Sequence, residues 1–156
     1  MKILIVYYSR TNVTANVVDE VSKKLNCDIE KINDLSNRSG PLNYLKSGYD
    51  AIRKNETKIG STKKNPSDYD LVIIGTPVWA GTMSSPILTY LNQNIDKIKN
   101  LCVIVTFGSS GDESTIRNIE KIINKHSIAS LKISRKDFKS SFTHKVDEFV
   151  NKIEKI

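Results

Sequence analysis

The sequence predicts an α/β domain in which a doubly wound, five-stranded parallel sheet carries helices on both faces. Three continuous apolar runs, at residues 3–8, 71–74 and 101–107, support this prediction. Unbroken apolar runs are typical of strands that are buried on both faces, as in a helix-covered parallel sheet. Between the runs the hydrophobic period becomes helical, which gives the order β-α-β-(α)-β-α-β-α-β-α.

Two weaker strand candidates, residues 27–32 and 130–133, mix polar residues with apolar ones. We therefore expect them at the sheet edges, which favours the strand order 2-1-3-4-5 with the three apolar strands in the middle. The chain of 156 residues suits a single domain over residues 1–156.

Four apolar stripes at helical spacing follow the predicted strands. They are Val17, Val18, Val21 and Leu25 after the first strand; Ile87 or Leu88, Leu91 and Ile95 after the third; Ile116, Ile119, Ile122 and Ile123 after the fourth; and Phe142, Val146, Phe149, Val150 and Ile153 at the end. Residues 33–67 are less regular, and we expect one short helix at about residues 44–53.

The net charge of +7 and the pI of about 9.4 raise the question of an anionic partner. A lysine-rich composition is the plainer explanation, and residues 46–64, with a local balance of +4, are typical of a solvated face. No arginine cluster is interleaved with aromatics, so we expect no nucleic-acid binding.

The remaining composition gives no sign of a membrane or metal protein. No apolar run approaches the roughly 20 residues of a membrane span, and the N-terminus is typical of a strand rather than of a signal peptide. We expect a cytoplasmic protein. Cys27 and Cys102 are far apart and show no metal-ligand spacing, so we expect two buried free thiols within strands and no metal site.

The loops that follow the three central strands should form any ligand site, because ligands of open α/β sheets bind beyond the strand carboxyl ends. The first loop, residues 9–14, offers the hydroxyls of Ser9, Thr11 and Thr14 and free amides at a helix N-terminus. This combination favours a phosphate group, although it lacks the motifs of a P-loop or a dinucleotide fold. Ordinary helix capping by serine and threonine is the alternative explanation.

The second loop, residues 76–82, contains the only tryptophan, Trp79. At the rim of the sheet its large π surface can stack on a flat heterocycle, and packing beneath a loop is the alternative. Ala80 and Gly81 would let the backbone approach a ligand closely. The third loop, residues 108–113, adds small residues beside the same place, and Asp112 or Glu113 is expected to cap the next helix.

These loops resemble those of the flavodoxin family over nearly the whole chain. Ser9-Arg10-Thr11-Asn12-Val13-Thr14 is similar to the family's phosphate loop, usually written [ST]-x-T-G-x-T. Residues 74–82 and 106–111 resemble its second and third flavin loops, and residues 40–51 resemble a subgroup of small flavodoxin-like proteins. Flavodoxin is itself a standard example of the strand order 2-1-3-4-5.

The resemblance implies FMN as the cofactor. By position, Ser9, Thr11, Asn12 and Thr14 would hold its phosphate together with the amides of Arg10 and Val13; Pro77, Val78, Trp79, Ala80 and Gly81 would flank the isoalloxazine; and Phe107, Gly108, Ser109, Ser110 and Gly111 would line the pyrimidine side. No side chain is assigned a catalytic role.

The implied function is electron transfer, with a flavin that cycles between oxidised, semiquinone and hydroquinone forms. The partners would be redox proteins, acidic ones included because of the positive charge, and the chain would be a monomer or a weak dimer.

Two departures from the family pattern keep other functions open. Asn12 replaces the usual glycine, which it can do because asparagine tolerates positive φ. The third loop lacks the aromatic residue that covers the second flavin face in the best-known flavodoxins, and an open face would admit a substrate. An FMN-dependent NAD(P)H:quinone oxidoreductase is therefore the alternative function, and a fold that has lost FMN is another.

Overall fold

A five-stranded parallel sheet forms the centre of the computed structural model, which describes residues 1–36 and 56–156. Its strands are β1 (Ile3–Tyr7), β2 (Asp28–Lys31), β3 (Leu71–Trp79), β5 (Leu101–Phe107) and β6 (Ser130–Ser134). They lie in the order β2-β1-β3-β5-β6, and a short strand, β4 (Thr82–Met83), pairs only with β3. The predicted order 2-1-3-4-5 of the parallel strands is confirmed.

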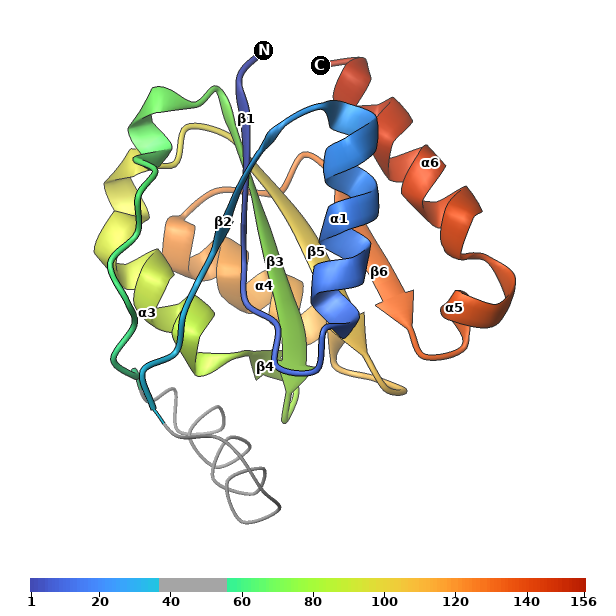
Figure 1. The fold of residues 1–156 in the computed structure, drawn as a ribbon, viewed down its shortest axis with the longest axis horizontal. Helices are drawn as coiled ribbons and strands as arrows, with labels where there is room; N and C mark the ends of the chain where they lie inside the picture. Colours follow the sequence, from blue (N-terminus) through green and yellow to red (C-terminus); the bar gives the residue numbers. More distant parts are fainter. Residues whose placement is uncertain (37–55) are drawn as a thin grey trace.

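Helices cover both faces of the sheet (Figure 1). α1 (Val13–Leu25) and α6 (Phe142–Glu154) pack on one face, and α3 (Ser85–Asn94) and α4 (Asp112–Ile123) pack on the other. The short elements are η1 (Pro66–Asp68), η2 (Ile95–Lys97) and α5 (Asp137–Ser140). All four predicted helical stripes face the sheet, with Leu25, Ile95, Ile122 and Phe142 only partly buried.

The two helix layers explain why the central strands contain no polar alternation. Within β1, Leu4 packs with α3 and α4, whereas its neighbour Ile5 packs with α1 and α6. Each is completely buried, as are Ile73 and Val103 in the neighbouring strands. A strand that is covered on both sides must be apolar at every position, which is the pattern in the sequence.

β3 is longer than the sequence predicted. We expected the strand at residues 71–74 and a loop at 76–82, whereas β3 continues to Trp79 and turns back into β4. Pro77 is tolerated because β1 pairs with β3 only as far as Gly75, so the missing Pro77 amide would have faced no partner strand. Ala80 and Gly81 both have positive φ, 48° and 77°, the pattern of a type I′ hairpin turn.

Some smaller predictions need correction or lie outside the described ranges. Cys102 is a buried free thiol, as expected, and burial raises its pKa to about 11. Cys27 is free but only partly buried, and it precedes β2 instead of lying within it. The expected helix at residues 44–53 and the segment 40–51 lie within residues 37–55, which are not described. The same holds for residues 46–55 of the basic run at 46–64.

The five parallel strands point their carboxyl ends toward one edge of the molecule, the lower edge in Figure 1, where the β3–β4 hairpin also lies. Both termini lie at the opposite edge. Among the described helices, none has the length and apolar character that crossing a membrane requires.

Candidate functional site

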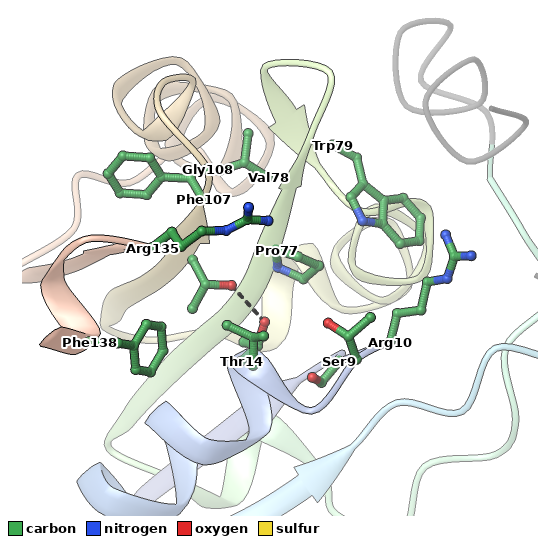
Figure 2. A pocket seen from close by; sticks show the side chains of 13 residues that line it. Ser9, Arg10, Thr14, Pro77, Val78, Trp79, Phe107, Gly108, Arg135 and Phe138 are labelled. Atoms are coloured by element: carbon green, nitrogen blue, oxygen red, sulfur yellow. Dashed lines mark hydrogen bonds between the residues drawn. The ribbon is translucent and has the colours of Figure 1, made fainter. Parts of the chain in front are cut away.

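A pocket with a volume of about 340 Å³ opens at the carboxyl ends of β1, β3 and β5. This volume falls in the range of roughly 300–1,000 Å³ that is typical of small-molecule sites. Its lining comes from all three predicted loops and from the segment that follows β6 (Figure 2). The lining residues are Ser9, Arg10, Thr11, Val13, Thr14, Pro77, Val78, Trp79, Thr106, Phe107, Gly108, Arg135 and Phe138.

The loop before α1 has the backbone geometry of an anion site. Asn12 adopts the left-handed conformation, with φ of 62° and ψ of 0°, as its replacement of a glycine led us to expect. Within the described ranges, the backbone N–H groups of residues 11–14 donate to no protein acceptor. Successive free amides around a left-handed residue at a helix N-terminus form a concave site for a phosphate or a similar anion.

The hydroxyls of this loop differ in how available they are. Ser9 Oγ accepts a hydrogen bond from the N–H of Ala15 at 3.2 Å, so it caps the helix but keeps its own proton for a ligand. The buried Thr14 hydroxyl is 2.8 Å from that of Thr106 on β5, and this bond joins α1 to the sheet at the pocket floor. Capping and ligand binding are therefore both compatible with Ser9, and Thr14 has a structural role in addition.

The hairpin contributes an apolar and aromatic wall. Pro77, Val78 and Trp79 line the pocket, and the Trp79 ring meets Tyr8 edge to face, with centroids 5.5 Å apart and an angle of 86°. Tyr8 is buried, so it supports the half-buried indole from the protein side. This support fixes the orientation of Trp79 at the rim.

The hairpin turn faces α4 instead of the pocket. Ala80 and Gly81 are not among the lining residues, and the Gly81 carbonyl accepts a hydrogen bond of 2.6 Å from the Ser114 hydroxyl. The Gly81 carbonyl is thus hydrogen-bonded to α4 and does not face the pocket. The Asn118 amide also donates to the Thr82 hydroxyl at 3.1 Å, which attaches the hairpin to α4 a second time.

The third loop reaches the pocket only through its first residues. Phe107 and Gly108 line the pocket, whereas Ser109, Ser110 and Gly111 do not. Gly111 has a φ of 94° and packs so closely on the hairpin that an added Cβ would lie 2.8 Å from Val78 Cγ1. Asp112 and Glu113 lie in the first turn of α4, where a negative charge suits the helix dipole. The N-cap is Gly111, however, and within the described ranges both carboxylates pair with Lys132 instead of capping the helix.

Three lining residues were not predicted: Thr106, Arg135 and Phe138. Thr106 lies within the segment that resembled a flavin loop, but its apolar strand suggested a core residue. Arg135 and Phe138 follow β6, the predicted edge strand. The rule that ligands lie beyond strand carboxyl ends applies to that strand too, so the predicted topology contains a signal for Arg135 and Phe138.

The pocket is polar at one end, apolar in the middle and positively charged. In the described part of the chain its ionisable lining consists of Arg10 and Arg135, with no carboxylate, lysine, histidine or cysteine. The arrangement can hold an anionic group at the α1 N-terminus and a flat apolar group beside Trp79, but it offers no side chain with the pKa of a general acid or base at neutral pH.

The sequence and the fold are similar to those of known proteins. A family model described as flavodoxin matches residues 2–153. No curated protein matches the sequence.

Solved structures share the fold over nearly the full chain. A flavoprotein from Lactobacillus acidophilus in complex with FMN has a TM-score of 0.72 at 21% identity, with 95% of this chain and 97% of that chain covered. For a Fusobacterium nucleatum flavodoxin bound to flavin mononucleotide the TM-score is 0.62 at 12% identity, with coverage of 99% and 97%. A flavodoxin from the domain Archaea gives 0.61 at 14% identity, with coverage of 99% and 98%.

Proposed function

Because the chain belongs to the flavodoxin family, we propose that its pocket binds FMN and that the protein transfers electrons between redox partners. The similar structures from Lactobacillus acidophilus and Fusobacterium nucleatum contain this nucleotide. The observation that carries the proposal is the set of free amides at residues 11–14, which lies at one end of a pocket whose middle is apolar and aromatic.

The phosphate of FMN fits the α1 N-terminus. Its oxygens accept hydrogen bonds only, and the N–H groups around Asn12 and the Ser9 hydroxyl proton are donors that have no acceptor among the described residues. The helix dipole adds a favourable electrostatic contribution for a negative group at this position. Ser9, Arg10, Thr11, Val13 and Thr14 would therefore surround the phosphate, with Asn12 shaping the loop from outside the pocket.

The isoalloxazine ring fits the rest of the pocket. Pro77, Val78 and Trp79 provide an apolar wall on the hairpin side, and Phe107 and Gly108 provide the wall at the end of β5. A flat heterocycle gains from both burial and contact with the indole face. Gly81 and Gly111 would act indirectly, because they hold the hairpin against α4. Ala80, Ser109 and Ser110 do not line the pocket.

Bound FMN would supply the redox chemistry, since a flavin accepts and releases electrons by itself. The protein's part would be to bind the nucleotide, orient it and set the electrostatic environment. The lack of a general acid or base among the described lining residues supports an electron carrier over an enzyme that must move protons for its substrate.

The direct test compares FMN with riboflavin, which lacks the phosphate. We expect FMN to quench the fluorescence of Trp79, the only tryptophan, and to bind about tenfold or more tightly than riboflavin because of the charge-assisted hydrogen bonds. Trp79→Ala should weaken both ligands alike, with binding followed by the fluorescence of the flavin itself because no tryptophan remains. Asn12→Val should weaken FMN alone. Equal affinities for FMN and riboflavin in the unaltered protein would contradict the phosphate site.

Two further results would distinguish an electron carrier from the alternative functions. A protein that neither co-purifies with FMN nor binds it when added would be a fold that has lost its cofactor. Rapid NAD(P)H oxidation by the FMN-loaded protein with a quinone acceptor would replace the carrier with an FMN-dependent NAD(P)H:quinone oxidoreductase. We expect slow NAD(P)H oxidation and fast reduction by a protein donor, with rates that fall as salt is added if the partner is acidic.

A further inference from the structure

Arg135 is the least expected charge in the pocket, and it is built into the rim. It directly follows β6, and its backbone N–H donates to the Phe107 carbonyl at 3.1 Å. This bond ties Arg135 to the end of β5, beside the third loop. Figure 2 shows the guanidinium group extending from the rim toward Val78 and Pro77.

The neighbouring residues hold this segment in place. The Asp137 carboxylate accepts a hydrogen bond from the backbone N–H of Ser134 at 2.6 Å, and pairs with Lys145 on α6 at 2.8 Å. It also accepts from the Ser141 hydroxyl at 2.8 Å. The turn that carries Arg135 is thereby attached to β6 on one side and to α6 on the other.

The same contacts leave Arg135 without a carboxylate partner in the described part of the chain. Asp137, the nearest acidic residue in sequence, is directed to Lys145 and the Ser134 amide. Lys132 pairs with Asp112 and Glu113 at the start of α4. Within residues 1–36 and 56–156 no carboxylate forms an ion pair with Arg135, and none lines the pocket.

We propose that Arg135 makes the pocket bind two-electron-reduced FMN more tightly, relative to oxidised FMN, than it would without this charge. The inference rests on the proposed function, because it assumes that FMN is the ligand. Two-electron reduction with uptake of one proton leaves the flavin ring with a negative charge, whereas the oxidised ring is neutral. A guanidinium group on the pocket wall attracts the charged ring and leaves the neutral ring nearly unaffected.

The measurement is the ratio of two dissociation constants, for oxidised FMN in air and for dithionite-reduced FMN under argon, both by calorimetry. The FMN phosphate is present in both forms, so its attraction to Arg135 cancels in the ratio. We expect Arg135→Gln to lower the preference for reduced FMN by about three- to tenfold, the effect of one solvent-exposed charge on the pocket rim. By thermodynamic linkage, the midpoint potential of the bound flavin should fall correspondingly.

Two controls separate the local charge from other effects. Arg135→Lys keeps a cation at the rim and should retain most of the preference. Lys136→Gln removes the same charge one residue away, from a side chain that is exposed like Arg135 but does not line the pocket, and should change the ratio little. Oxidised FMN binding by Arg135→Gln shows that this variant is folded.

The failures of the two proposals can be told apart. If the unaltered protein does not bind oxidised FMN, the proposed function fails, and this inference fails with it. If it binds FMN but Arg135→Gln shows an unchanged ratio, or Lys136→Gln lowers the ratio as much, the role of Arg135 is refuted while FMN binding stands.

Discussion

Asn12 holds the backbone of the phosphate-loop candidate in a conformation that most residues avoid. Its φ of 62° lies in the left-handed region, which costs a branched residue about 1–2 kcal/mol. We predict that Asn12→Val lowers the free energy of unfolding by this amount in urea titrations, whereas Asn12→Gly leaves it unchanged or raises it slightly.

A matched control is available one helical turn away. Asn16 is exposed in α1, where asparagine and valine have similar helix propensities, so Asn16→Val should change stability by less than about 0.5 kcal/mol. If Asn12→Val and Asn16→Val cost the same, the left-handed conformation does not matter for stability.

The buried pair of Thr14 and Thr106 is a second residue-scale feature of the pocket. Each threonine is at most 4% exposed, and their hydroxyls bond only to each other among the described residues. We predict that Thr14→Val and Thr106→Val each cost about 1–2 kcal/mol, because each leaves the other hydroxyl buried without a partner. The double variant should cost clearly less than the sum of the two.

Thermal or chemical unfolding of the four proteins in this cycle measures the coupling. The exposed Thr143 on α6 provides a control, since Thr143→Val removes a hydroxyl without leaving a buried partner. Strict additivity of the two pocket variants would show that the hydrogen bond contributes nothing of its own.

At the scale of elements, the β3–β4 hairpin depends on its contact with the start of α4. Gly111 allows this contact, because an added Cβ would meet Val78 at 2.8 Å and Gly81 Cα at 3.0 Å. Its φ of 94° is also unfavourable for any other residue. We predict that Gly111→Ala lowers stability by about 2–4 kcal/mol from strain and overpacking together.

Gly108 offers the matched comparison in the same loop. An added Cβ there would meet nothing within 4 Å, and its φ is not in the left-handed region. Gly108→Ala should therefore be nearly neutral in the same unfolding experiment. A similar loss of stability in both variants would mean that the loop is merely sensitive to any side chain.

The β3–β4 hairpin could not be predicted from the sequence, whereas most of the other elements could. The helices and central strands could be predicted because an apolar stripe or an unbroken apolar run reports burial directly. Thr76, Pro77 and Trp79 carry no such signal, since a proline in a strand normally argues against it. β3 tolerates Pro77 only because β1 ends opposite Gly75, which is a property of the neighbouring strand and not of the local sequence.

In the whole molecule, the strand order predicts where the site lies but not which residues line it. Once strands one, three and four are placed in the centre, the loops beginning at Ser9, Thr76 and Gly108 must meet at one edge. Which residues of each loop face the pocket could not be predicted, because Gly81 and Gly111 are held by contacts with α4 and with each other. Arg135 and Phe138 follow the fifth strand, which the sequence predicts as an edge strand.

The fold also carries a pH dependence that involves several elements. Although burial alone would raise the pKa of the Asp137 carboxyl, hydrogen bonds from Lys145, Ser134 and Ser141 hold it well below its usual range. Burial alone would likewise raise the pKa of the Glu120 carboxyl, but hydrogen bonds from Ser127 lower it. These hydrogen bonds join the end of α4 to the segment before β6. Both carboxyls bind a proton more weakly in the folded protein than in the unfolded one.

A carboxyl with a lowered pKa stabilises the fold above its unfolded pKa of about 4, and this contribution is lost as the pH falls toward the folded value. We predict that stability declines steeply on acidification below about pH 4, and that Asp137→Asn makes this decline shallower while lowering stability at pH 7. Urea titrations at a series of pH values measure the slope. Asp96→Asn is the control, because Asp96 forms no ion pair with the described residues, and equal slopes for the two variants would exclude the Asp137 contacts as the cause.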